Sequence, residues 1–135
     1  NQSLLSQERY NEMTDYVGLF ALFHDCRRKC EYEDEGHGLR AAWFLRDLQV
    51  KGYFSHSYSQ ELFEAVSYAC SVHSDVAPFT GDIGFLKRKN YYYGHFAEIC
   101  IDANRLDWQR LGIIPYDYYF FTETAKEIAK DLRKI

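Results

Sequence analysis

Apolar residues recur every three to four positions in five segments of this 135-residue chain, a spacing that places them on one face of an α-helix. The segments span residues 8–25, 37–50, 59–73, 96–110 and 122–134. They do not alternate with strand patterns, as the helices of a parallel α/β sheet would. The sequence therefore predicts an all-α helical bundle.

Two stretches lack the helical pattern. Residues 74–84 contain Pro78 together with glycine and aspartate, a composition typical of a loop. Residues 85–96 hold three consecutive tyrosines without a clear helical period, and a short strand is one interpretation of them. The chain has no internal repeat and no Pro/Gly-rich linker, so we expect residues 1–135 to form a single domain.

Composition narrows the classes of function. The chain has 16 Lys and Arg residues against 20 Asp and Glu, a net charge of −4, which argues against a general affinity for nucleic acid. No apolar run approaches the ~18 residues of a membrane-spanning helix, so no membrane contact is expected. Four cysteines and the lack of a secretory signal pattern favour a cytoplasmic protein.

Several polar residues lie on the apolar faces of the predicted helices rather than opposite them. His24 follows Phe20 by four positions, for example, so both side chains share one helix face. Buried imidazoles and carboxylates persist only when they are hydrogen-bonded, paired or bound to a metal. Any one of these residues is explained by hydrogen bonding, but as a group they predict a site for a divalent metal such as Zn, Mn, Ni or Fe. The group consists of His24, Asp25, His37, His73 and Asp102.

The adjacent pair His24-Asp25 lies in the run LFHDCRRKCEYEDEGHGLRAA, which is followed by YACSVHSD and, around Asp102, by ICIDANRLDWQRLGIIP. This ordered set resembles the HD-domain superfamily of metal-dependent phosphohydrolases, in particular its small single-domain bacterial members. The resemblance implies an HD-type helical bundle in which His24, Asp25 and Asp102 hold a metal. It also implies that His37 and His73 supply ligands in members with a second ion, so that one or two ions bind. The implied reaction is hydrolysis of a small phosphorylated compound such as a nucleotide.

The family pattern also has a histidine on an earlier helix, and no histidine precedes His24 in this chain. Two interpretations stay open. In the first, that helix lies upstream of Asn1 and residues 1–135 form an HD-type domain without its N-terminal helix. In the second, the chain is a catalytically inactive HD fold that binds a ligand or a protein partner.

Charged neighbours of the predicted ligands suggest how such a site would act on phosphate. Asp25 is expected to orient the attacking water, and Arg28 and Arg105 to contact the phosphate, because a guanidinium binds phosphate with two parallel hydrogen bonds. Arg27 and Arg40 are further candidates. The alternative for these arginines is a solvated helix face or an ion pair with an acidic neighbour, namely Glu31, Glu33, Asp34 or Glu35.

A third interpretation concerns residues 87–96, where cations are mixed with aromatic rings. This mixture is typical of segments that bind single-stranded nucleic acid, although one short segment on an acidic chain is thin support.

Overall fold

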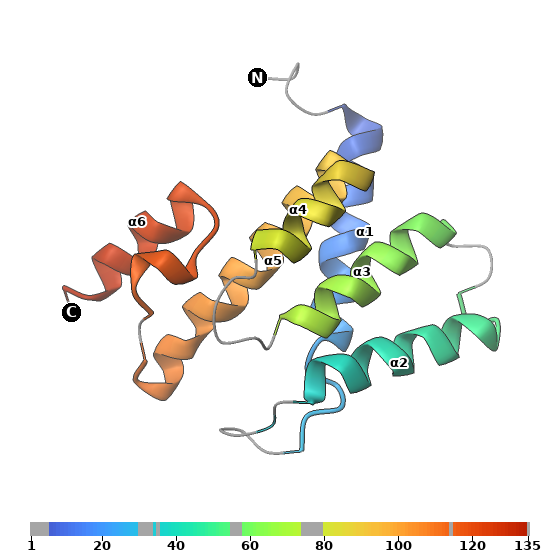
Figure 1. Cartoon of the computed structure of the whole chain (residues 1–135), viewed down its shortest axis with the longest axis horizontal. Coiled ribbons are helices and arrows are strands. Elements are labelled where there is room, and N and C mark those ends of the chain that lie inside the picture. Colours follow the sequence, from blue (N-terminus) through green and yellow to red (C-terminus); the bar gives the residue numbers. More distant parts are fainter. Residues whose placement is uncertain are drawn as a thin grey trace. The chain divides into compact units, whose positions relative to one another are not determined.

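In the computed structural model, the described part of the chain is built of helices joined by turns and loops and holds no strand, which confirms the all-α prediction (Figure 1). The structure describes residues 6–29, 34, 36–54, 58–73, 80–113 and 115–134. None of the helices in these ranges is long and apolar enough to cross a membrane. The α-helices are α1 (Gln7–Phe23), α2 (His37–Val50), α3 (Gln60–Val72), α4 (Thr80–Lys89), α5 (Tyr91–Leu106) and α6 (Glu123–Leu132). Two short 3-10 helices follow α5: η2 (Asp107–Leu111) and η3 (Asp117–Tyr119).

The chain divides into two compact units, residues 1–74 with α1 to α3 and residues 75–135 with α4 to α6. Each unit is described below by itself. The expectation that residues 1–135 form one HD-type domain stays a prediction.

In the first unit α3 packs against both α1 and α2 (Figure 1). The side of α3 that carries Phe63, Val66 and Cys70 is buried, as its helical spacing predicts. Tyr16 of α1 is fully buried, and its hydroxyl donates a hydrogen bond of 3.1 Å to the backbone carbonyl of Ala65. This bond satisfies the one polar atom of a large buried ring and joins α1 to α3.

The helices α3, α5 and α6 each begin at a residue whose side chain accepts a hydrogen bond from a backbone amide in the first turn. The Ser59 hydroxyl accepts a hydrogen bond from the Leu62 amide at 3.1 Å, and the Thr122 hydroxyl accepts one from the Ala125 amide at 3.2 Å. Ser59 is the N-cap of α3 and Thr122 is the N-cap of α6. The side chain of Asn90 likewise accepts from the amide of Tyr93 at the start of α5.

In the second unit the structure differs from the sequence analysis over residues 80–95. The prediction of a loop is wrong for residues 80–84, which lie in α4, and so is the strand considered as one interpretation of the tyrosine run, which lies in α5. Ile83 and Leu86 are both buried and three positions apart, so they form a narrow apolar face on α4. Most other residues of α4 are polar, so the sequence pattern does not indicate this face. Residues 74–79 of the expected loop lie outside the described residues.

Candidate metal centre

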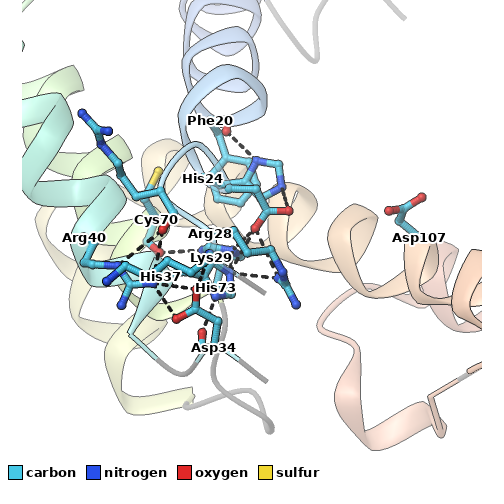
Figure 2. Close-up of polar contacts among 12 residues, drawn as sticks. Phe20, His24, Arg28, Lys29, Asp34, His37, Arg40, Cys70, His73 and Asp107 are labelled. Atoms are coloured by element: carbon cyan, nitrogen blue, oxygen red, sulfur yellow. Dashed lines mark hydrogen bonds and ion pairs between the residues drawn. The ribbon is translucent and has the colours of Figure 1, made fainter. Parts of the chain in front are cut away.

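Three helix ends of the first unit carry one histidine each. His24 is the C-cap of α1, His73 is the C-cap of α3, and His37 is the first residue of α2. Asp25 follows His24 directly. Figure 2 shows the three histidines gathered in one place, with Arg28 and Asp34 beside them. The structure therefore brings together four of the five metal ligands that the sequence predicts.

The ligand atoms of these side chains converge on the Asp25 carboxylate. Asp25 Oδ1 lies 3.0 Å from His37 Nε2 and 3.3 Å from His73 Nε2, and Asp25 Oδ2 lies 3.4 Å from His24 Nε2. The Nε2 atoms of His37 and His73 are themselves 3.0 Å apart. Within the described residues, His24, Asp25 and His73 form a group able to hold a metal ion, with ligand atoms all within 4.8 Å of one another.

Backbone carbonyls fix the tautomer of each ring. The Nδ1 atom lies 2.9 Å from the Phe20 carbonyl in His24, 2.5 Å from the Asp34 carbonyl in His37, and 2.6 Å from the Cys70 carbonyl in His73. A carbonyl oxygen can only accept, so each Nδ1 must carry a proton and donate it. A neutral ring protonated at Nδ1 has a bare lone pair at Nε2, the atom that faces Asp25.

This arrangement needs a positive charge among the Nε2 atoms. Two lone pairs 3.0 Å apart, both directed at a carboxylate oxygen, repel one another unless a proton or a cation lies between them. Protonation is opposed at the deepest ring, because burial lowers the pKa of His73 below its usual value. A metal cation satisfies all three lone pairs and the carboxylate at once, and the Nδ1 hydrogen bonds are the outer-shell contacts that orient histidine ligands.

The spacing of the ligand atoms also fits a cation. With metal–ligand bonds of ~2.0 to 2.1 Å, neighbouring ligands stand about 3.4 Å apart in a tetrahedron and about 3.0 Å apart at the corners of an octahedron. The three separations from Asp25 and the one between His37 Nε2 and His73 Nε2 run from 3.0 to 3.4 Å. Because α1 and α3 both end at this point, their C-terminal dipoles add to the attraction for a cation.

Burial falls steadily across the centre. His73 is fully buried and the side chain of His37 is 5% exposed, whereas that of Asp25 is 36% exposed. The imidazoles therefore form the buried side of the centre, which we call its floor, and the Asp25 carboxylate lies at its solvent-accessible side, which we call its rim.

The carboxylate is charged over the whole neutral range. The His73 ring is the main cause that holds the pKa of Asp25 well below its usual value, because a proton at its Nε2 atom would be donated to the carboxylate; positive charge on His24, His73 and His37 acts in the same direction against burial. Arg28 stands at the same rim, with its Nη1 atom 3.5 Å from Asp25 Oδ1 and 3.3 Å from His37 Nε2. One guanidinium is therefore in place beside the predicted ligands.

Asp34 and Arg40 bind each other and the backbone of residues 27 and 29. The Asp34 carboxylate accepts from Arg40 Nη2 at 2.5 and 2.6 Å and from the amide of Lys29 at 2.5 Å. Arg40 also donates to the carbonyl of Arg27. Since the carbonyl of Asp34 receives the His37 proton, this network fixes the outer shell of the centre.

The structure thus confirms the ion-pair alternative for Arg40. Arg27 lies with its guanidinium 3.8 Å from the centre of the Phe44 ring, a cation–π contact. The other acidic partners considered for these arginines, Glu31, Glu33 and Glu35, lie outside the described residues.

Asp102 and Arg105 belong to the second unit, on α5. The two oxygens of Asp102 accept hydrogen bonds of 2.8, 2.8 and 2.7 Å from the Phe121 amide, the Thr122 amide and the Thr122 hydroxyl. Asp102 is therefore a structural residue that secures the start of α6. Arg105 is 1% exposed, beside Asp102 on the same helix. The metal ligation assigned to Asp102 and the phosphate contact assigned to Arg105 stay predictions.

Sequence reasoning named Asp34 only as an ion-pair partner for the arginines, and it missed the three carbonyl acceptors, one of which belongs to Asp34. One sequence feature indicates the carbonyl acceptors: each histidine follows its acceptor by three or four residues, which is the spacing of adjacent helical turns. No family model, curated protein or solved structure matches this chain. The case for the centre therefore rests on its geometry, and the resemblance to the HD superfamily stays a prediction.

Proposed function

We propose that this chain is a metal-dependent phosphohydrolase of the HD type that acts on a small phosphorylated compound such as a nucleotide. One observation carries the proposal. Three imidazoles, each with its proton held at Nδ1 by a backbone carbonyl, direct their Nε2 atoms at one carboxylate. This donor set of nitrogen and oxygen suits Zn, Fe, Ni or Mn.

A divalent cation at this centre supplies activation of water and neutralisation of phosphoryl charge. The chain's own residues do the rest. His37 and His73 form the buried floor that excludes bulk water from one side, and Asp25 at the rim accepts a hydrogen bond from the attacking water. Arg28 binds the phosphoryl oxygens from the same rim, because its guanidinium is fixed within reach of Asp25 and carries a permanent charge.

Metal binding is tested first, by equilibrium dialysis of the chain against Zn, Mn, Ni and Fe followed by elemental analysis. The wild-type chain should retain one or two ions, and Asp25→Asn, which keeps the shape but removes the charge, should lower the affinity at least about 100-fold. The control is His95→Gln, because His95 lies in the second unit and pairs with Glu98. Retention of no metal by the wild type, or equal losses in both variants, contradicts the proposal.

Turnover is tested separately, with a panel of phosphomonoesters and nucleotides and the metal-loaded chain. Arg28→Met should lower kcat/KM while metal content stays unchanged, because Arg28 is assigned to the phosphate and not to the ion. Bound metal without any turnover contradicts the hydrolase and favours the alternative role, an inactive HD fold that binds a ligand or protein partner.

A further inference from the structure

The corner at which α4 ends and α5 begins gathers cations and aromatic rings on one surface. Arg88 and Lys89 are exposed in the last turn of α4, and Tyr91 and Tyr92 are exposed in the first turn of α5. Only Asn90 separates the two helices. We call this surface the α4–α5 corner, made of Phe85, Lys87, Arg88, Lys89, Tyr91 and Tyr92.

The charge of the corner is opposite to that of the chain as a whole. The second unit has nine basic and nine acidic residues, so the excess negative charge of the chain lies in the first unit. Residues 83–97 contain three cations and no acidic residue. Glu98 neutralises one of these cations through an ion pair of 2.9 Å with Lys87, which leaves Arg88 and Lys89 as the charges that face solvent.

The rings at the corner are held in place while their surfaces stay accessible. Tyr91 is 60% exposed, and its ring lies 5.6 Å from Lys87 Nζ and nearly parallel to the His95 ring at 6.3 Å. Tyr92 is 38% exposed and meets Tyr91 edge to face. Phe85 is 45% exposed, with Lys89 Nζ 5.6 Å from its ring. Exposed rings of this kind are stacking platforms, and every nucleobase has a face that can stack on them.

We propose that the α4–α5 corner binds single-stranded nucleic acid, with bases stacked on Tyr91 and Tyr92 and phosphates on Arg88 and Lys89. The corner belongs to the second unit and the metal centre to the first, and the proposal does not depend on the metal centre. The cations favour a negatively charged partner, and the exposed rings favour one with flat faces that can stack on them. A single strand offers both, because its bases and phosphates alternate.

The test is fluorescence anisotropy of the full chain with labelled oligothymidylate and oligouridylate of about twelve nucleotides. Binding should weaken as salt increases. Tyr91→Ala should weaken it about tenfold, whereas Tyr91→Phe, which keeps the ring, should bind like the wild type. Replacing both Arg88 and Lys89 by Ala should reduce the slope of log affinity against log salt by about 1.4.

Matched controls lie elsewhere in the second unit. Tyr116→Ala removes a tyrosine that is 71% exposed, and Lys130→Ala with Lys134→Ala removes two exposed cations of the C-terminal region. The controls should bind like the wild type, and equal losses in controls and corner variants overturn the assignment. Absence of binding to both oligonucleotides at low salt overturns the proposal, and if vesicles containing phosphatidylserine bind instead, the partner is a lipid surface.

Discussion

At the scale of single residues, the metal centre depends on which ring nitrogen of each of the three histidines carries the proton. Each histidine donates its Nδ1 proton to a backbone carbonyl three or four residues earlier, and His24 also stacks on the Phe20 ring at 4.7 Å. These contacts fix both the ring orientation and the tautomer before any ligand arrives. Little reorganisation is therefore needed for all three Nε2 atoms to bind a cation.

The same residues predict how the metal-free chain responds to acid. Burial lowers the pKa of His73 from its usual 6.5, and interaction with the His73 ring lowers that of Asp25 from 3.8. In both cases the unfolded chain takes up the proton first, so the free energy of unfolding should fall as the pH drops through about 6.5, and again below about 4. Urea unfolding in chelator between pH 8 and pH 3 measures this, and Asp25→Asn should flatten the lower limb. A free energy of unfolding that rises toward pH 5 contradicts the account.

Asp102 allows a test of a second residue-level assignment. Burial raises the pKa of Asp102, while three donated hydrogen bonds and the Arg105 charge favour its ionised form. Asp102→Asn keeps the shape but replaces one acceptor by a donor that faces other donors. We expect it to destabilise the chain by about 1–3 kcal/mol in urea unfolding. The same variant decides whether Asp102 is also a ligand, since unchanged metal affinity rules that assignment out.

At the scale of elements, the link between α1 and α2 positions two ligands at once. Arg40 holds the Arg27 carbonyl and the Asp34 carboxylate, and these residues lie just after Asp25 and just before His37. Arg40→Met should therefore lower metal affinity about 10- to 100-fold while the helices stay folded. Zn titration with circular dichroism measures both properties. Arg46→Met on the exposed side of α2 is the control, and equal affinities in the two variants would exclude a positioning role for Arg40.

The α4–α5 pair depends on a close approach at Gly94. A Cβ atom at this position would lie 2.7 Å from the backbone nitrogen of Lys87 and 2.8 Å from its Cα, which is closer than real Cβ contacts. Gly94→Ala should therefore destabilise the second unit by about 1–3 kcal/mol because a helix backbone must shift.

Gly84 of α4 is the matched control for this prediction. A Cβ atom there would lie 3.4 Å from the flexible guanidinium of Arg88, and Gly84→Ala should stabilise the helix by about 0.8–1.0 kcal/mol. Thermal unfolding separates the two variants. A melting temperature for Gly94→Ala at or above that of the wild type would contradict the packing described here.

At the scale of the whole molecule, spacing alone predicted most helices but placed some faces wrongly. In α1, Val17 shares the helical spacing of Met13 and Phe20 but is 38% exposed, whereas Tyr16 and Leu19 are buried. The helix expected over 96–110 begins at Tyr91 and gives way to a 3-10 helix at Asp107. A sequence with apolar residues on more than one side of a helix does not specify which side meets its neighbour, because tertiary packing decides this.

The candidate site shows the same limit. His24, Asp25, His37 and His73 could be named from the sequence because polar residues on apolar faces need an explanation. The hydrogen bonds that fix the tautomers of the three histidines could not be predicted from the sequence, since these bonds depend on where each helix begins or ends. The structural role of Asp102 could not be predicted either, because it depends on residues 121–122 lying against α5.

X-ray absorption spectroscopy of the zinc-loaded full chain tests the metal centre most directly. The account predicts scattering from nitrogen and oxygen at ~2.0 to 2.2 Å, with the outer-shell pattern of three imidazoles and no sulfur. Loss of one imidazole from the pattern in His37→Ala would identify that ligand. A zinc–sulfur distance of ~2.3 Å, or a spectrum without imidazole scattering, would contradict the central claim.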